Sequence, residues 1–231
     1  MKIVILFLDK VNKNYDNIAE ILVMCYNSQA NKNQEGAEWV TRQEQALRSR
    51  QKIMDTAMLL IEEKGYANVT IKDICEKSGL SIGTFYHYFS NIAEILFTFY
   101  NQYDSMLEEG LAAHHYETWR EEADYLCRTY LELTLKNGWQ VSSAVISTQF
   151  RIEEKYLYRE ERFLNQKLRS MIEKGKACGD IRADEETDQL CAWLLRSVRG
   201  AIFDWVMHDG KTDLMSTGVH DYSRVLDEMM E

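Results

Sequence analysis

The 231-residue chain contains no proline. Proline ends helices and fixes the loops between them, because its ring restricts φ and removes a backbone donor. A chain of this length without proline is typical of long helices joined by glycine and polar turns. Hydrophobic residues make up 45% of the sequence, which is enough to bury a core, so we predict a globular, all-α protein.

Apolar residues recur at helical spacing along most of the sequence. The first strong stripe is Ile53, Ala57, Leu60 and Ile61, and its helix should end at Gly65. A short helix should begin directly after Thr70, which reads as its N-cap, with the acidic Asp73 at the third helical position as in a capping box. Further helices are predicted over about 82–88, 91–109, 118–136, 139–150, 152–176, 184–207 and 219–230. We find no repeat and no strand pattern.

The first 45 residues differ from the rest. They contain a short apolar run at 3–8 and many asparagines, and 29–38 reads as a linker. The run is too short for a signal peptide or a membrane span. We therefore predict three parts: an N-terminal extension (1–45), a head (46–92) and a helical body (93–231). The extension either reflects the choice of translation start or is a dispensable arm.

The charge is unevenly distributed. The formal net charge is −10, which taken alone argues against nucleic-acid binding. Between Arg48 and Ile92, however, basic residues slightly outnumber acidic ones, so the acidity lies elsewhere. The five cysteines include no CxxC pair, which favours free thiols in the reducing cytoplasm.

The stretch around residues 70–89 has the pattern of a helix-turn-helix, with Gly79 in the turn. Its second helix groups small, hydroxyl and aromatic residues in under two turns: Gly83, Thr84, Tyr86, His87 and Tyr88. Hydroxyl and N–H groups donate to phosphates, and ring edges can reach bases. Ile82, Phe85 and Phe89 are left to anchor the helix inward. This residue set favours DNA binding.

From about Arg50 to Leu96 the sequence resembles the TetR family of bacterial transcriptional regulators. The matching features are the apolar stripe, Gly65-Tyr66, Thr70, Ile74, Gly79, Ser81 and the run from Gly83 to Phe89. The resemblance implies a three-helix helix-turn-helix head followed by a larger helical body for ligand binding and dimerisation. It also implies a homodimer that binds double-stranded operator DNA as a repressor and is released by an unidentified small-molecule effector.

The resemblance also implies roles for individual residues. Phosphate contacts would come from Thr70, Thr84, Tyr86 and Tyr88, and base contacts from Gly83 and His87. Arg48 and Arg50, which are expected before the first helix, would contact the neighbouring backbone or minor groove. Ser81, as helix cap, joins this DNA-binding set. One position departs from the family. A lysine is common at the start of the fourth helix, where this chain has Ile92, which suggests weaker and less salt-sensitive binding.

The body contains no family motif, so its site residues follow from residue type and the resemblance. The candidate ligand-pocket residues are Tyr125, Trp139, Gln149, Phe150, Tyr156 and Trp193, although each is also compatible with ordinary core or surface. The candidate dimer stripe is Leu190, Leu194, Ser197, Val198, Ala201 and Trp205.

Other functional classes find little support in the sequence. No histidine or cysteine spacing indicates a metal site, no cofactor motif is present, and no serine or cysteine lies in a nucleophile motif. We therefore predict a protein that is not an enzyme and does not act at a membrane. The alternative to a regulator is a helical binding or adaptor protein that has lost sequence-specific DNA recognition.

Overall fold

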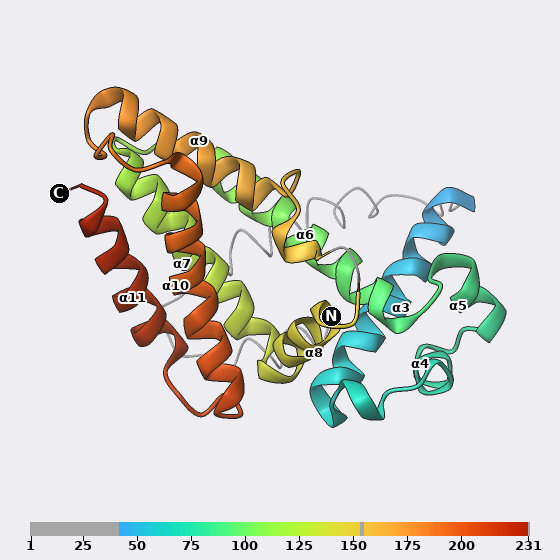
Figure 1. The fold of residues 1–231 in the computed structure, drawn as a ribbon. Helices are drawn as coiled ribbons and strands as arrows, with labels where there is room; N and C mark the ends of the chain where they lie inside the picture. Colours follow the sequence, from blue (N-terminus) through green and yellow to red (C-terminus); the bar gives the residue numbers. More distant parts are fainter. Residues whose placement is uncertain (1–41, 153–154, 231) are drawn as a thin grey trace. The chain divides into compact units, whose positions relative to one another are not determined.

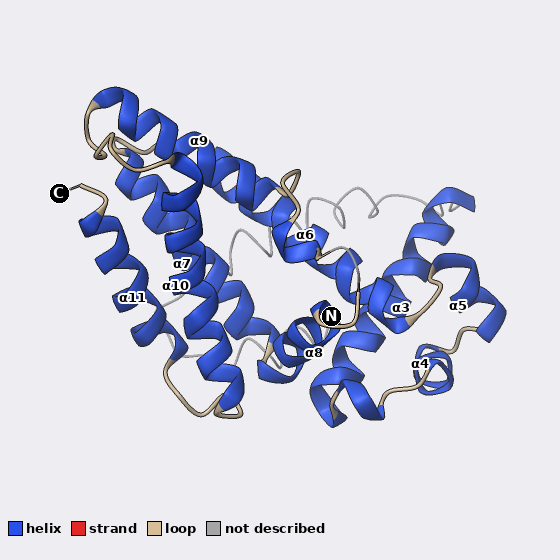
Figure 2. Ribbon diagram, in the orientation of Figure 1, coloured by secondary structure: helices blue, strands red, loops and turns tan. Residues whose placement is uncertain are grey.

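The computed structural model describes residues 42–152 and 155–230, and in these ranges it contains nine α-helices, two short 3-10 helices and no strand (Figure 2). This confirms the predicted all-α fold. The predicted N-terminal extension lies almost entirely outside the described residues. Contacts divide the chain into Met1–Gln45 and Ala46–Glu231, and the packing described below belongs to the second unit.

Three helices form the head: α3 (Arg42–Lys64), α4 (Ile71–Ser78) and α5 (Ile82–Tyr88). The stripe on α3 buries Ile53, Ala57 and Ile61 completely, and Ile74 of α4 and Phe85 of α5 are equally buried. Burying such side chains stabilises a fold by about 1.5–3 kcal/mol each. This small core holds the two short helices, which would not be stable alone.

Helix α6 (Ile92–Ala112) runs from the head into the body (Figure 1). The Asn91 side chain caps it by accepting the Glu94 N–H at 2.9 Å, and Glu94 in turn accepts the Ser90 N–H at 2.7 Å. The predicted end before Gly110 is wrong, because α6 continues to Ala112. A Cβ at Gly110 would lie 2.8 Å from the Tyr125 hydroxyl, so this glycine permits close packing on α7.

The body contains α7 (Trp119–Asn137), α8 (Trp139–Gln149), the 3-10 turn η3 (Tyr156–Tyr158), α9 (Phe163–Cys178), α10 (Thr187–Met207) and α11 (Leu214–Glu228). Helices α10 and α11 pack side by side, and α7 contacts both of them (Figure 1). Among the described residues, none of the helices has the length and apolar character that a membrane crossing requires.

One predicted helix is wrong. The sequence suggested a continuous helix over 152–176, but α9 begins only at Phe163, and η3 precedes it. Residues 155–162 instead contact α6, α8 and α10. Tertiary contacts here override local helix propensity.

Candidate nucleic-acid interface

A tight turn joins α4 to α5 and fixes their geometry. Gly79 ends α4 in the left-handed region, with φ 67° and ψ 26°, where glycine is favoured. The Leu80 N–H donates to the Cys75 carbonyl at 3.1 Å, so a terminal carbonyl of α4 stays paired. This is a helix-turn-helix, in which the second helix can enter a major groove.

Side-chain caps hold both helices of this unit. The Thr70 hydroxyl accepts the Asp73 N–H at 3.1 Å and Asp73 accepts the Thr70 N–H at 2.8 Å, which completes a capping box. Hydrogen bonds from Lys64 and Thr70 hold the pKa of the Asp73 carboxyl well below its usual range. Ser81 caps α5 by accepting the Thr84 N–H at 3.0 Å.

Helix α5 has one buried and one exposed face. Phe85 is fully buried and Phe89, just after the helix, is 1% exposed, so both anchor α5 as expected. The expectation that Ile82 points inward is wrong, because its side chain is 51% exposed. Ile82 lies on the solvent side with Tyr86, which is 57% exposed, and with His87.

Seven of the nine DNA-binding residues suggested by the sequence either lie in α5 or cap α4 and α5. Five of them are exposed and two are half-buried; the exposed ones are Thr70, Ser81, Gly83, Tyr86 and His87, and the half-buried ones are Thr84 and Tyr88. The hydroxyls of Ser81 and Thr84 lie 2.8 Å apart and hydrogen-bond to each other. The His87 ring meets the Tyr88 ring edge-on, with 4.7 Å between centroids. Contacts of this set with DNA stay a prediction.

The two arginines differ from their predicted setting. Both lie inside α3, because the helix begins at Arg42 rather than after them. Arg48 is exposed. Arg50 is half-buried, donates to the Thr98 hydroxyl at 3.4 Å and lies 5.1 Å from the centre of the Phe89 ring. Arg50 thus ties α3 to α6, a contact that sequence spacing could not reveal.

Three of the four lysines of the head lie beside acidic side chains. Lys64 pairs with Asp73 at 2.8 Å, Lys77 with Glu63 at 2.6 Å, and exposed Lys72 lies 3.7 Å from Glu76. The sequence has no lysine or arginine between Lys77 and Arg120, so α5 presents neutral donors and acceptors to the solvent. An interface of this kind would release few counterions from DNA.

The candidate pocket residues do not share one environment. Phe150 is 79% exposed, whereas Gln149 and Tyr156 are buried. The other three are half-buried in separate places. Tyr125 packs on His114, Trp139 lies against the backbone of Gly210, and Trp193 lies under Arg182. Phe150 therefore does not line an interior pocket in this structure.

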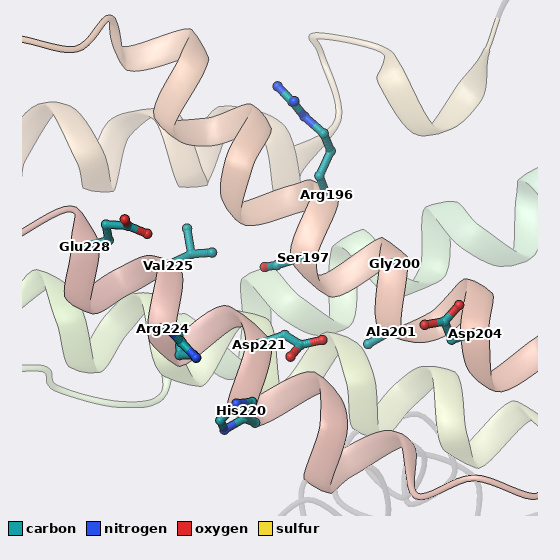
Figure 3. Close-up of a pocket in the computed structure, with 10 residues that line it drawn as sticks. All are labelled: Arg196, Ser197, Gly200, Ala201, Asp204, His220, Asp221, Arg224, Val225 and Glu228. Carbon is teal, nitrogen blue, oxygen red and sulfur yellow. The ribbon is translucent and has the colours of Figure 1, made fainter.

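The proposed dimer stripe needs correction. Five of its side chains are buried in the chain's own core: Leu190, Leu194, Val198, Ala201 and Trp205. Ser197, which is half-buried, and the buried Ala201 border an open groove between α10 and α11, lined also by Gly200 and charged residues of both helices (Figure 3). The stripe therefore belongs mostly to the chain's own core, where α10 packs against α7, α8, α9 and α11.

Sequence reasoning missed a polar cluster inside the body. Arg162, whose side chain is only 2% exposed, donates to both oxygens of Asp104 at 2.7 and 2.9 Å. The rings of Tyr100 and Tyr156 lie beside this pair, with 6.3 Å between their centroids. A charged residue within the apolar stripe of the 91–109 helix was the available signal for Asp104.

Comparison with known proteins agrees with this geometry. Residues 53–98 match the family model "Bacterial regulatory proteins, tetR family". An uncharacterised HTH-type transcriptional regulator of Bacillus subtilis, YfiR, is 28% identical over 163 residues, which are 65% of this chain and 76% of YfiR.

Two solved structures show the same fold. A TetR-family regulator from Syntrophomonas wolfei superposes with a TM-score of 0.66 at 21% sequence identity. The match covers 80% of this chain and 96% of the regulator's chain. The FadR repressor of Thermus thermophilus was solved with lauroyl-CoA. It superposes with a TM-score of 0.61 at 19% sequence identity, and the match covers 79% of this chain and 95% of FadR. With the capped helix-turn-helix and the all-α body, these matches show that residues 53–98 are similar to the tetR family of bacterial regulatory proteins and that the described chain shares the fold of such regulators.

Proposed function

We propose that the protein is a dimeric transcriptional repressor that binds operator DNA through α5 and is released by a small-molecule effector. The observation that supports this best is the helix-turn-helix, in which α5 is anchored by Phe85 and presents Tyr86 and His87 to the solvent. A helix held by one buried ring and exposing polar rings is suited to a DNA groove.

Within this proposal the DNA contacts divide into two kinds. The hydroxyl of Tyr86 and the N–H groups at the start of α5 would bind phosphates, and His87 would reach a base edge beside Gly83. Because three lysines of the head are paired with acids, they would contribute little positive charge to the binding. We place the protein in the cytoplasm, where its DNA is.

Dimerisation would bring two heads onto one operator. The exposed side of α10 presents Phe203 and Met207, which are 45% and 64% exposed. The adjoining groove contains residues of both charges, among them Arg196, Asp204 and Arg224 (Figure 3). A two-fold axis would let opposite charges from two copies meet around these apolar side chains. The surface thus fits a second copy of this chain.

The effector class follows from a structural neighbour. FadR of Thermus thermophilus was solved with lauroyl-CoA. We propose an amphipathic acyl thioester of this kind as the first effector to test, bound within the body (93–231). Long apolar helices suit the acyl chain, because ligand pockets are mostly apolar with a few polar groups.

A mobility-shift experiment with the DNA upstream of the protein's own gene tests this function. We expect a retarded band that unlabelled upstream DNA removes and unrelated DNA does not, and that lauroyl-CoA weakens. The acidic total charge and the neutral face of α5 favour the alternative, an adaptor protein without DNA recognition. Equal competition by both DNAs, or no retarded band, would favour that alternative.

A further inference from the structure

Residues 155–162, which we term the connector, form hydrogen bonds with α6 at two points. The Tyr156 hydroxyl donates to the Asn101 side-chain oxygen at 2.6 Å. Arg162 donates to Asp104 through Nε and Nη2, at 2.9 and 2.7 Å. Asn101 and Asp104 are three residues apart and therefore lie on the same side of α6. One turn of α6 is thus held by both ends of the connector.

The connector is also fastened to α10. Arg199 donates through Nη2 to the Leu157 carbonyl at 2.8 Å, and its guanidinium lies 4.8 Å from the centre of the Tyr158 ring. Arg199 is half-buried, and a guanidinium that stacks on a ring while it donates to a carbonyl has a fixed position. The connector therefore bridges α6, which leads to the head, and α10, which contains the proposed dimer surface.

Hydrogen bonds to the neighbouring helices keep the connector in place. The Gln149 side chain at the end of α8 accepts the Leu157 N–H at 3.2 Å. The Asn165 side chain in α9 donates to the Arg159 carbonyl at 2.6 Å. Within the connector, the Arg162 guanidinium lies 4.9 Å from the centre of the Tyr156 ring. These contacts explain why the segment does not continue α9 as a helix.

We infer that the connector is a positioning element that fixes α6 relative to α10 and so sets the placement of the DNA-binding head. The effect on DNA binding rests on the proposed function. That the connector holds α6 rests on the contacts alone. Thr98, which receives the hydrogen bond from Arg50 of α3, lies one turn before Asn101. A shift of the Asn101 turn therefore reaches the head through a rigid helix.

The buried ion pair between Arg162 and Asp104 favours one discrete position of α6 over intermediate positions. Separating Arg162 from Asp104 leaves two charges buried without partners, which is strongly unfavourable, so intermediate positions of α6 are disfavoured. Coupling between distant sites needs an element with discrete arrangements that both sites influence. The connector touches the helix that leads to the head and the helix of the proposed dimer surface, so both can influence it.

Two variants each remove one contact of the connector, the first to α6 and the second to α10. Tyr156→Phe deletes the hydroxyl that holds Asn101, and Arg199→Ala deletes the tie to α10. Each has a matched control in the body. Tyr222→Phe deletes a buried hydroxyl that donates to Asp124 at 2.8 Å, and Arg169→Ala removes the ion pair between α9 and Asp188 of α10. Neither control touches the connector by these contacts.

The first measurement is hydrogen exchange of the full-length protein without DNA. We expect Tyr156→Phe and Arg199→Ala to speed exchange of the connector and of the α6 turn around Asn101 by about 3- to 10-fold, as the loss of a hydrogen bond should. The two controls should leave exchange there unchanged. Unchanged α6 exchange in both connector variants, or an equal increase in the controls, would overturn the inference.

The second measurement uses operator DNA whose half-site spacing is varied by single base pairs. We expect the connector variants to lose wild-type spacing preference, and the double variant to lose no more than the worse single one, because both cut the same route. If the losses of spacing preference in the two single variants simply add in the double variant, the two contacts do not act through the same connector, and the inference is overturned. A wild-type protein that binds no DNA would overturn the proposed function, while the exchange data would still decide whether the connector holds α6.

Discussion

The exposed residues of α5 differ in what each can offer DNA. Tyr86 ends in a single hydroxyl, which suits a phosphate, whereas His87 has ring nitrogens that can address a base edge. We predict that Tyr86→Ala weakens binding to all operator sequences alike. His87→Ala should instead relax discrimination at one base pair, by about 1–3 kcal/mol for a good base contact. Selection from a randomised operator library measures both, and an unchanged preference for His87→Ala would contradict its role.

Glu62 contacts the body from the last turns of α3. Its carboxylate lies directly against Gly138, at the start of α8, and one of its oxygens has no hydrogen-bond partner among the described residues. Burial raises the pKa of Glu62 above its ordinary 4.5, and the N–H groups of Val141 and Gln140 only partly oppose this. The folded protein therefore holds this proton more tightly than the unfolded chain, and stability falls as pH rises through the interval above 4.5.

This sign leads to a pH prediction. Glu62→Gln removes the titrating group and keeps the shape of the side chain. We expect the melting temperature of this variant relative to wild type to rise between about pH 4.5 and pH 7. Glu63→Gln is the control, because Glu63 pairs with Lys77 inside the head at 2.6 Å. A difference between Glu62→Gln and wild type that is constant with pH, or that falls, would refute the assignment.

For single residues, the sequence predicted contacts between neighbours in the chain, such as helix caps. The caps at Thr70 and Ser81 were expected and are present, because a cap depends only on residues three or four positions apart. The setting of Arg50 was not predictable. Its partner Thr98 lies 48 residues away, and only the packed fold brings the two together.

The start of α6 tests how the head meets the DNA backbone. Ile92 is half-buried and packs against the core, and lysine can keep that packing with its aliphatic stem while its ammonium reaches solvent. We predict that Ile92→Lys tightens operator binding. Each new phosphate contact adds about −0.9 to the slope of log K against log salt, so a dimer should change by nearly −2. Salt titrations of wild type, Ile92→Lys and the neutral Ile92→Met measure this, and equal slopes would contradict it.

Two helix junctions depend on glycine for different reasons. Gly79 has φ 67° but open space around a Cβ, whereas at Gly138, with φ 86°, a Cβ would collide with the Glu62 carboxylate. We predict that Gly79→Ala lowers the free energy of unfolding by about 1–2 kcal/mol, the cost of a left-handed residue. Gly138→Ala should cost more. Urea denaturation measures both, and an equal or smaller loss for Gly138→Ala would show that Glu62 moves aside freely.

Element boundaries were predictable where a local signal marks them and not elsewhere. Helix α7 was expected over 118–136 and is found at Trp119–Asn137, since Thr118 caps it and Gly138 ends it. Helix α9 was expected to begin near residue 152 but begins at Phe163. No glycine or proline marks this boundary. The contacts of the connector with Asn101, Asp104 and Arg199 set it, and these are separated widely in sequence.

For the whole molecule, the sequence indicated the all-α class but not which side of each helix meets solvent. The stripe from Leu190 to Trp205 on α10 was apolar enough for a dimer surface, yet most of it is buried in the core of the same chain, where α10 contacts α7, α8, α9 and α11. Helical periodicity identifies an apolar face without identifying what covers it. The exposed side of α10, with Phe203 and Met207, becomes visible only after the helices are packed.

The final prediction joins effector, body and head in one measurement. If an acyl thioester releases the operator, the binding of each must weaken the other by the same factor, because the two share one thermodynamic cycle. Such couplings are typically about 5–150-fold. We therefore expect the Kd of lauroyl-CoA to rise by a factor in this range when saturating operator DNA is added.

Intrinsic tryptophan fluorescence provides the readout for the Kd, since Trp139 and Trp193 are half-buried in the body and respond to changes around them. Unrelated DNA at the same concentration is the control and should leave the Kd unchanged. The connector variant Arg199→Ala should keep the DNA-free Kd but reduce the coupling factor, because the route from body to α6 is cut. A Kd that is identical with and without operator would show that effector and DNA are not linked, and release by an acyl thioester would then be excluded.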